Sequence, residues 1–397
     1  MKTNEALSGM YKICFLGSGE LLLDRAKSLG IFVALIQKQA SASIEAIRRA
    51  DSILMCDYDD PDNMDLMLNF IRGQGIDKVL TLSEKALNAA AMLNDSLSGK
   101  TQESVVCNLL KNKVLMREKL KGTCFGNVKF LPVSSGEELH QAGLTLKYPF
   151  ILKPVSGVGS ENVRLIGDEK TLAAVSIEQD FIAEQFIGGK EYSVEAFSQH
   201  GMHTIHAITE KSLFKNKNSS FVEQGHTVAR VNNEGAFFSS VETFIGEFLD
   251  LIGIRDGATH TEIKIDEGVI YIIESHNRVG GDSIPELVYH STGTDLYTLA
   301  IQASAGLHLD NVRKPVIRDS GIRFFEFEPG LVRCIYGEQS VKLFPFVKDV
   351  FVPELSNVAI SGPIDSFSRH GYVICTSSDN VSLCLDRCIA AIQVSYN

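Results

Sequence analysis

The feature that most constrains this chain is the stretch THTEIKIDEGVIYIIESHNRVGGD at residues 259–282, in which two strand-like segments meet at a turn. Successive side chains of a strand point to opposite faces, so Glu262 and Lys264 share one face. An antiparallel pairing around the turn at residues 266–268 would set Glu262 close to Glu274 on the second segment.

Two carboxylates that lie side by side repel each other, and such a pair normally needs a cation between them. Hard oxygen ligands of this kind suit Mg²⁺ or Mn²⁺. In the second segment Glu274, His276 and Arg278 share one face by the period of two. Taken alone, the hairpin also fits a solvated surface element with charged outer positions.

Composition limits the possible classes of protein. A chain of 397 residues can form two or three domains, and 44% hydrophobic with 22% charged residues is typical of a soluble globular protein. The net charge of −11 argues against nucleic acid as a partner, because such binding needs a basic surface. A nucleotide as a small ligand stays possible, since a few local cations suffice.

The sequence predicts a cytoplasmic protein without a membrane partner. Residues 1–9 are polar with no signal-peptide pattern after them, and the longest clean apolar run, residues 31–36, is too short to span a bilayer. The eight cysteines contain no Cys-x-x-Cys pair, and Cys384 and Cys388 lie one turn apart on an expected helix. We therefore expect buried free thiols rather than disulfides or a zinc site.

The N-terminal part alternates between strands and helices. We expect strands at residues 11–16, 31–36, 52–56 and 78–82, and helices at 21–29 and 63–74. The Gly17-Ser18-Gly19 turn lacks the third glycine of a dinucleotide fingerprint and is interpreted as a tight turn. Glu84 follows the last strand, where it fits either a substrate contact or a carboxylate at a helix start. A helix is predicted at 109–120.

A second stretch with the residues for chemistry is KYPFILKPVSGVGSENVRLIG. A strand at residues 150–152 delivers Lys153 to a turn that contains Gly157, Gly159 and Ser160. Glycine lets the backbone approach an anion closely, and its N–H groups can hold phosphate oxygens beside a lysine. The lysine precedes the glycines and no helix follows, so this is not a P-loop. A plain hairpin with a glycine turn remains the alternative.

The next segment, FIAEQFIGGKEYSVE, alternates as a strand over residues 182–187. Its backbone can offer amide and carbonyl groups to an adenine edge, and Glu191 can accept both ribose hydroxyls. Solvated strand carboxylates are the alternative for Glu184 and Glu191. The polar residues 211–220 show no periodicity and predict a mobile loop of the kind that closes over reactive intermediates. His226, which follows it, fits either a substrate site or the surface.

The remainder of the chain changes from helical to strand-rich character. A helix is expected at 241–252 and a broken pair of helices at 284–306, followed by strands at 321–327, 341–346 and 372–376 and a helix at 381–393.

Together these pieces resemble the ATP-grasp superfamily of carboxylate–amine ligases, and most of all its amino-acid ligase (dipeptide synthetase) branch. The resemblance covers almost the whole chain. It depends on NKVLMR with Lys113, on ILKPVSGVGS, EQFIGGKEYSVE and FVEQGH, and on TEIK followed by ESHNRVGGD.

The resemblance implies an α/β (α+β) fold in three parts. Residues 1–108 would form an open parallel α/β domain, residues 109–311 the ATP-grasp domain with a lid at about 126–195, and residues 312–397 a mostly β subdomain. ATP with Mg²⁺ or Mn²⁺ would be the cofactors, and the resemblance suggests a homodimer.

The resemblance also implies roles for individual residues. Lys113 and Lys153 would contact ATP phosphates, and Arg278 would stabilise an acyl phosphate and the tetrahedral intermediate that follows it. Glu262 and Glu274 would ligate the metal. The other expected nucleotide contacts are Gly157, Gly159, Ser160, Glu184, Phe186 and Glu191. The expected amino-acid pocket is lined by Glu84, Glu223, His226, His276 and Gly281.

The chain departs from the superfamily's pattern at two positions. Many members have Asn two residues after the second metal glutamate, whereas this chain has His276 there and Asn277 next. Strand alternation points His276 toward the site and Asn277 away, and leaves open whether His276 contacts substrate or metal. Ala229 stands where related ligases often have proline.

The implied reaction is phosphoryl transfer from ATP to a carboxylate, attack of an amine on the acyl phosphate, and release of phosphate. His226 or Glu223 would accept the amine's proton. Alternatives are a ligase that loads an amino acid onto a carrier-protein thiol, a purine-pathway or biotin-dependent carboxylase, and a catalytically inactive nucleotide-binding module. The sequence does not reveal which amino acids are joined.

Overall fold

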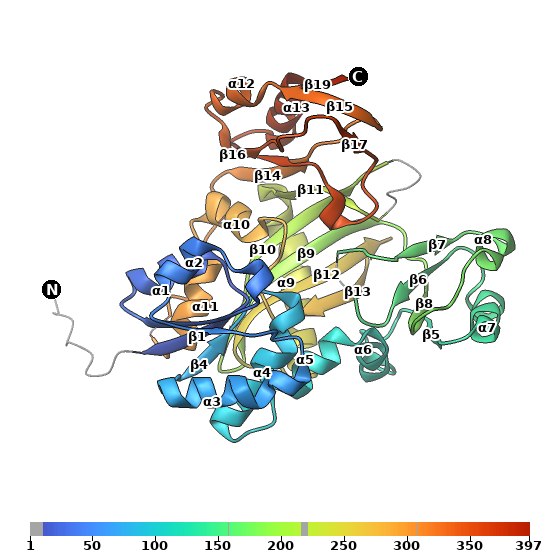
Figure 1. Cartoon of the computed structure of the whole chain (residues 1–397). Coiled ribbons are helices and arrows are strands. Elements are labelled where there is room, and N and C mark those ends of the chain that lie inside the picture. Colours follow the sequence, from blue (N-terminus) through green and yellow to red (C-terminus); the bar gives the residue numbers. More distant parts are fainter. Residues whose placement is uncertain (1–10, 158, 216–220, 308) are drawn as a thin grey trace.

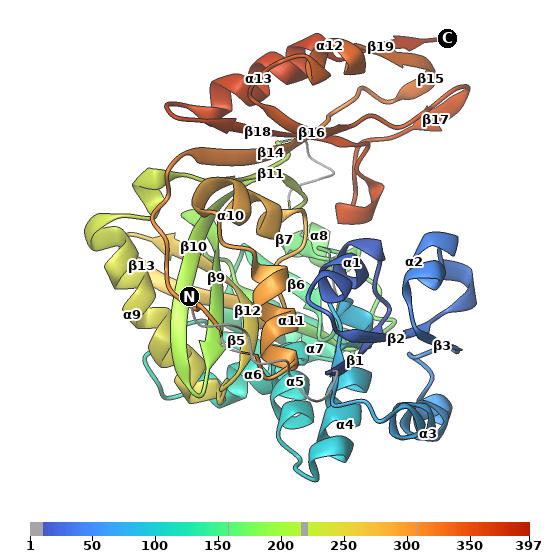
Figure 2. The same cartoon turned by 90° about the vertical axis from the view of Figure 1, so that its left-hand side faces the viewer.

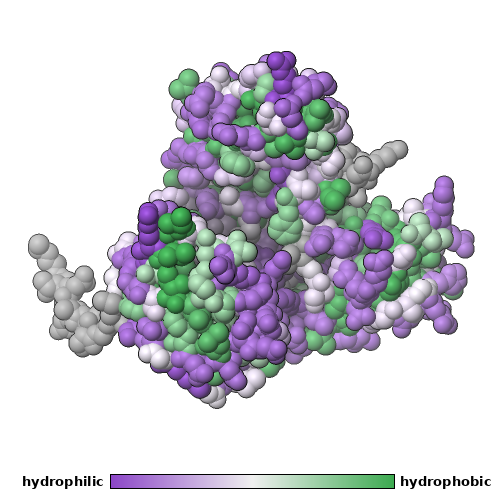
Figure 3. Space-filling view, in the orientation of Figure 1, coloured by the Kyte–Doolittle hydropathy of each residue, from purple (hydrophilic) through white to green (hydrophobic). Residues whose placement is uncertain are grey.

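The computed structural model describes residues 11–157, 159–215, 221–307 and 309–397. Figure 1 shows a large central sheet with the N-terminal helices and strands in blue on one side, a small green lid on the opposite side and the C-terminal region in red above. The surface is hollowed where these parts meet, and hydrophilic residues border the hollow (Figure 3). No helix of the described residues has the length and apolar character needed to cross a membrane.

The N-terminal region is an open parallel sheet, as the alternating pattern predicts. Its strand order is β3-β2-β1-β4, and all three pairings are parallel. The strands are β1 (Lys12–Leu16), β2 (Phe32–Gln37), β3 (Ser52–Met55) and β4 (Lys78–Leu80), and the helices are α1 (Glu20–Ser28), α2 (Ile44–Arg49), α3 (Met64–Gln74) and α4 (Leu87–Ser98). Continuous apolar runs such as β1 suit strands covered on both faces. The carboxyl ends of β1 and β4 carry Gly17 and Glu84.

The predicted single helix at residues 109–120 is wrong. The structure has α5 (Glu103–Lys111) and α6 (Lys113–Leu120), which are separated at Asn112. The Asn112 side chain accepts hydrogen bonds from the backbone N–H groups of Val114 and Leu115, so it caps a new helix instead of continuing the old one. Lys113 is therefore the first residue of α6.

The lid is a four-stranded antiparallel sheet in the order β5-β8-β6-β7. It contains β5 (Phe130–Val133), α7 (Gly136–Leu146), β6 (Phe150–Pro154), β7 (Arg164–Ile166), α8 (Glu169–Ala173) and β8 (Phe181–Gln185). The apolar side chains Phe150 and Leu152 are buried beneath the two helices, which leaves Lys153 on the opposite face.

The central sheet has eight antiparallel strands in the order β13-β12-β9-β10-β11-β14-β18-β16. They are β9 (Lys190–Gln199), β10 (Met202–Leu213), β11 (Glu223–Val228), β12 (Gly257–Asp266), β13 (Val269–His276), β14 (Asp319–Phe324), β16 (Val347–Phe351) and β18 (Tyr372–Ser377). The helix α9 (Gly235–Ile252) covers one face, where Ile263 and Ile272 are fully buried. Figure 2 shows α10 (Ile284–Thr292) and α11 (Leu296–Ser304) against the opposite face.

The predicted hairpin at residues 259–282 is confirmed. The strands β12 and β13 pair in antiparallel register, and Glu262 lies directly opposite Glu274. Ile263 and Ile272 face α9. Regular alternation would put Glu274 on the same face as Ile272, but a register shift between Glu262 and Ile263 interrupts it and sets the two carboxylates opposite each other, outside the apolar cluster under α9.

The C-terminal region adds a second small sheet in the order β17-β15-β19, with two helices. Its elements are β15 (Gly330–Tyr336), α12 (Glu338–Lys342), β17 (Val358–Ile360), α13 (Val381–Ala391) and β19 (Gln393–Tyr396). The strand predicted at residues 341–346 is wrong, because α12 ends at Lys342 and β16 begins at Val347. A short apolar run does not separate strand from buried helix by its pattern alone.

The strands β14, β16 and β18 continue the central sheet, although they come from the region predicted as a separate subdomain. The boundaries near residues 108 and 311 stay a prediction. All eight cysteines are free thiols, as expected, and Cys14, Cys107, Cys375 and Cys388 are buried.

Candidate active site

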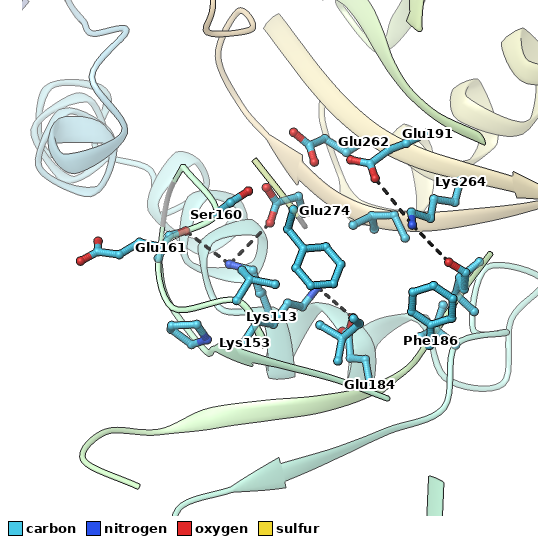
Figure 4. A pocket seen from close by; sticks show the side chains of 18 of the residues that line it. Lys113, Lys153, Ser160, Glu161, Glu184, Phe186, Glu191, Glu262, Lys264 and Glu274 are labelled. Atoms are coloured by element: carbon cyan, nitrogen blue, oxygen red, sulfur yellow. Dashed lines mark hydrogen bonds and ion pairs between the residues drawn. The ribbon is translucent and has the colours of Figure 1, made fainter. Parts of the chain in front are cut away.

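A cleft lies between the lid and the β12–β13 hairpin (Figure 4). It is lined by eleven of the residues that the sequence singled out, namely Lys113, Lys153, Gly157, Gly159, Ser160, Glu184, Phe186, Glu191, Glu223, Glu262 and Glu274. Segments that are more than a hundred residues apart in the chain therefore meet at one cavity, as the motif interpretation requires.

Lys153 is held in place by a buried glutamate. Its Nζ lies 2.8 Å from an oxygen of Glu184, and Arg117 on α6 holds the other oxygen at 2.7 Å. Arg117 also donates to the Ile272 carbonyl of β13 at 2.7 Å, which ties α6 to the hairpin. Burial opposes ionisation of Glu184, but Arg117 and Lys153 outweigh it and lower its pKa to about 2. The side chain of Glu184 thus positions Lys153, a function that the sequence did not indicate.

Lys113 joins the glycine-rich turn to the hairpin. Its backbone N–H donates to the Val155 carbonyl at 3.1 Å. Its Nζ donates to the Gly157 carbonyl at 3.3 Å and lies 3.5 Å from Glu274. The start of α6 and the turn therefore hold one ammonium group beside Glu274.

The predicted adenine and ribose segment lies along the cleft wall beside Lys264. This lysine donates to the Ile187 carbonyl at 3.1 Å, lies over the Phe186 ring and is 3.7 Å from Glu191. The sequence placed Lys264 on the same face as Glu262 but assigned it no role. Adenine and ribose contacts at Glu184, Phe186 and Glu191 stay a prediction.

The largest difference from the sequence analysis concerns Lys211. The prediction of a mobile loop over residues 211–220 is wrong at its start, because β10 continues to Leu213. Residues 216–220 lie outside the described residues. The Lys211 side chain is buried, and its Nζ lies 2.6 Å from Glu262, 3.3 Å from Glu191 and 3.5 Å from Glu223.

Burial works against the charge on Lys211, but the three carboxylates outweigh burial and raise its pKa well above the usual value. The Lys211 ammonium group therefore neutralises three carboxylates at once. They are Glu262 of the β12–β13 hairpin, Glu191 of the expected ribose site and Glu223 of the expected substrate pocket. The polar run that follows Lys211 hides this strand end, because it shows no apolar alternation.

Glu262 and Glu274, the carboxylates predicted to bind a metal, have matching surroundings. Glu262 lies between Lys211 and His260, whose Nε2 is 3.3 Å away. Glu274 lies between Lys113 and His276, whose Nε2 is 3.2 Å away. Burial opposes their ionisation, but Lys211 lowers the pKa of Glu262 to about 2, and Lys113 with His276 lowers the pKa of Glu274 well below its usual value.

Each of these histidines is backed by a further carboxylate. The Nδ1 of His260 lies 2.7 Å from Glu195, and the Nδ1 of His276 lies 3.2 Å from Glu84. Burial opposes the charge on His260, but Glu195 and Glu262 raise its pKa to about 9. As strand alternation predicts, His276 points into the site, while Asn277 turns away to the Cys107 thiol.

Arg278 is oriented by the N-terminal domain. Its Nε donates to Glu84 at 2.6 Å, and its Nη1 donates to the Val279 carbonyl at 2.8 Å. Burial opposes ionisation of Glu84, but His276 and Arg278 lower its pKa to about 2. Glu84 thus links the carboxyl edge of the parallel sheet to the end of the hairpin.

The expected substrate residue His226 belongs to a buried ion cluster. Its Nε2 lies 3.0 Å from Asp282, and Arg369 donates to both oxygens of Asp282, at 2.8 Å and 2.5 Å. Burial opposes ionisation of Asp282, but His226 and Arg369 hold its pKa far below the usual range. Asp282 and Ser283 both have left-handed backbone conformations, with φ of 52° and 57°, and follow Gly281. Arg369 was not anticipated.

Residues 365–369, here called the C-terminal strap, reach from the C-terminal region to this cluster. The Ser366 hydroxyl donates to Glu223 at 2.8 Å, and its backbone N–H donates to the Gly159 carbonyl at 3.1 Å. Gly159 has φ of 64°, and a Cβ there would lie 2.9 Å from the Phe367 ring, so glycine is required. The strap therefore touches both the glycine-rich turn and the expected substrate pocket.

Residues 168–286 match a family model described as an ATP-grasp domain. The chain has an ATP-grasp domain. The ATP-grasp resemblance inferred from the sequence is thereby confirmed, and so is the α/β architecture with a parallel N-terminal sheet and large antiparallel sheets.

Known proteins that this chain resembles include a dapdiamide synthase and L-amino acid ligases. Dapdiamide A synthase of Enterobacter agglomerans is 23% identical over 306 residues, which is 72% of this chain and 70% of that protein. The L-arginine-specific L-amino acid ligase of Bacillus subtilis is 23% identical over 253 residues, or 60% of each chain. The crystal structure of an L-amino acid ligase from Bacillus licheniformis superposes with a TM-score of 0.82 at 21% identity, and covers 98% of this chain and 99% of that one.

Proposed function

We propose that this protein is an ATP-dependent, ADP-forming ligase that activates an amino-acid carboxylate as an acyl phosphate and joins it to an amine, giving a dipeptide or amide. The observation that carries this proposal is the arrangement of Glu262 and Glu274. Both are opposed across a hairpin, held ionised, and surrounded by ammonium groups at the cleft that receives the glycine-rich turn. The similarity to amino-acid ligases supports the same conclusion.

The cleft supplies the charges that phosphoryl transfer demands. The transferred phosphoryl group spreads negative charge over its oxygens, and catalysis depends on positioning and electrostatic stabilisation. Lys113 and Lys153 approach from the lid side, and Lys211 approaches from the central sheet. In the proposed mechanism Lys113 and Lys153 hold the phosphates, and Gly157, Gly159 and Ser160 cover them with backbone N–H groups.

The carboxylates fit Mg²⁺ or Mn²⁺, because both donors are hard oxygens and are kept ionised by their neighbours. Among the described residues no group of three or more His, Cys, Asp and Glu side chains is arranged around a metal position. This agrees with a cation that takes its other ligands from phosphate oxygens and water, as Mg²⁺ usually does. Bound at Glu262 and Glu274, the cation would neutralise charge on the transferring phosphoryl group.

Arg278 is proposed to stabilise the acyl phosphate and the tetrahedral intermediate. Its Nε donates to Glu84 and its Nη1 donates to the Val279 carbonyl. Its Nη2 has neither of these two contacts among the described residues. His226 and Glu223 are the two candidates for accepting the proton from the amine. Glu223 lines the cleft, whereas the His226 ring is almost fully buried behind it and is oriented by Asp282.

The proposal is tested by incubating the protein with ATP, Mg²⁺ and pools of amino acids while phosphate release is measured and products are identified by mass spectrometry. We expect phosphate release that depends on particular amino acids, with the mass of a dipeptide or amide among the products. Binding of ATP without phosphate release in any pool would contradict the ligase and favour an inactive nucleotide-binding module. A mass gain only on an added carrier protein would replace the dipeptide activity with carrier loading. Assembly as a homodimer stays a prediction.

A further inference from the structure

Behind the Glu262 carboxylate lies a buried pair that the proposed reaction does not use. Glu195 on β9 and His260 on β12 are direct cross-strand neighbours in the central sheet. Glu195 is 0% exposed and His260 is 4% exposed. The His260 ring lies between two carboxylates, with Nδ1 2.7 Å from Glu195 and Nε2 3.3 Å from Glu262.

The pair lies outside the cleft lining, so it has no contact with substrate there. Its burial is unfavourable, because removing a carboxylate from water costs several kcal/mol unless its oxygens are paired. Oε1 of Glu195 is paired with His260, but Oε2 is buried and has no hydrogen-bond partner within the described parts of the chain. An apolar pair at these two facing positions would avoid this cost, so stability alone does not account for the arrangement.

The loop after Arg278 rests directly on the same pair. A Cβ at Gly280 would lie 2.9 Å from Nδ1 of His260 and 3.1 Å from Oε2 of Glu195. Contacts below 3.0 Å force a shift, so only glycine allows the backbone to approach this closely. The same pair thus adjoins both the metal carboxylate and the loop that carries Asp282.

The second metal carboxylate offers an informative contrast. His276 holds Glu274 and is backed by Glu84, but Glu84 also binds Arg278. Glu84 therefore also orients Arg278, which is proposed to touch the reacting groups. The Glu195–His260 pair has no such second task, so its effect on Glu262 can be measured separately.

We propose that Glu195 and His260 are positioning residues that fix the Glu262 carboxylate for divalent-cation binding and support the loop at residues 280–283. Groups that hydrogen-bond to metal ligands orient them, and their loss typically weakens metal binding about 10- to 100-fold. The inference rests on the proposed function in one respect only, the assignment of Glu262 as a metal ligand.

The test is Mn²⁺ binding to the full-length protein in the presence of ADP, measured by calorimetry and by electron paramagnetic resonance, without any turnover. We expect His260→Gln to weaken Mn²⁺ binding about 10-fold or more. Glu195→Gln keeps an oxygen acceptor for the ring and should give a smaller loss. His206→Gln is the matched control, since His206 is also a buried histidine of this sheet but contacts Asn311 instead. It should bind Mn²⁺ as the native protein does.

Equal Mn²⁺ affinity in the native protein and in the His260 and Glu195 variants would overturn the inference, whatever their thermal stability. If His260→Gln does not fold, Glu195→Gln and Gly280→Ala decide the question, because each disturbs the pair from another side. Weakened binding in either supports the pair's role, and native affinity in both overturns it. A native protein that binds Mn²⁺–ADP but releases no phosphate would contradict the proposed function and leave this inference standing. No Mn²⁺ binding by the native protein would overturn the metal assignment and the inference with it.

Discussion

The side of the cleft proposed to bind nucleotide and the side proposed to bind substrate, here called the nucleotide side and the substrate side, are built differently. On the side proposed to bind nucleotide, Lys153 pairs with Glu184 on the neighbouring strand, while Lys113 reaches Glu274 from helix α6. On the substrate side, each contact joins segments far apart in the chain, such as Arg278 with Glu84 and Arg369 with Asp282. Strand pairing therefore fixes the Lys153–Glu184 pair, whereas the other contacts depend on how distant segments are placed.

The difference has a physical basis in the two sets of partners. Strand pairing fixes neighbours on the nucleotide side to within one residue, because a register slip would move every side chain to the other face. The substrate side has no such rule, since Glu84 begins a short 3₁₀ helix after β4 and Arg369 belongs to the C-terminal strap. We expect substitutions on the two sides to separate into effects on nucleotide and metal binding and effects on amino-acid binding.

The largest effect is expected for Glu274→Gln on the nucleotide side. Loss of the negative charge weakens divalent-cation binding, and we expect turnover to fall on the order of 100-fold or more. The measurement is phosphate release at saturating ATP over a range of Mg²⁺ concentrations. Glu267→Gln, in the exposed turn of the same hairpin, is the control and should stay active. A fully active Glu274 variant would exclude this residue as a metal ligand.

Lys211→Met tests the group that joins the two sides. Its removal leaves Glu191, Glu223 and Glu262 without their shared cation, and breaking a buried ion pair typically costs about 3–5 kcal/mol. We expect a loss of that order in the free energy of unfolding, measured in urea, and a partial recovery with Mg²⁺ and ADP. Lys215→Met, at a nearby exposed lysine, should have little effect. An unchanged stability for Lys211→Met would show that the carboxylates do not depend on this ammonium group.

The pH dependence of stability should report the Glu184 ion pair. Its pKa is about 2 in the folded protein and about 4.3 when unfolded, so the unfolded state binds the proton more tightly. Its contribution, roughly 3 kcal/mol at most, is fully present above pH 4.3 and is lost as the pH falls toward 2.

Glu184→Gln should therefore be less stable at pH 7 and should lose less stability on acidification than the native protein. Unfolding in urea from pH 7 to pH 3 measures both effects. Glu178→Gln, an exposed glutamate of the same lid, should follow the native curve. A native acid dependence in Glu184→Gln would rule out this pair as a source of acid sensitivity.

The smallest effect is expected from Arg369→Ala on the substrate side. Asp282 would lose its bidentate partner, and the loop that follows Gly281 would be less well fixed. We expect KM for the amino-acid substrate to rise about 10-fold while KM for ATP changes little, because a charge-assisted pair is worth roughly 1.5–3 kcal/mol. Arg387→Ala, which removes an arginine stacked on Phe344, is the control. A rise in KM for ATP alone would assign Arg369 to the nucleotide side.

What the sequence predicted does not divide along these two sides, since Arg278 and Glu84 were singled out whereas Arg117, which holds Glu184, was not. The alternation of residues 259–282 predicted that Glu262 lies close to Glu274 and that His276 points inward while Asn277 points away. The direct pairing of the two glutamates also needs a register shift, which the pattern does not show. Lys211 was misassigned, because a charged residue at a strand end beside a polar run has no periodic signal of its own. Arg117 was visible only as one of several charges on a predicted helix.

The sequence by itself determined the segments that carry the chemistry, the hairpin with its two carboxylates and the lysine before a glycine-rich turn, because strand alternation and backbone freedom are local properties. Tertiary structure alone decided which buried charges compensate one another. Lys211 neutralises three carboxylates, Glu195 meets Glu262 through His260, and the C-terminal strap reaches the glycine-rich turn. These contacts depend on segments brought together by packing, and a buried charge acquires its partner only when the whole fold has formed.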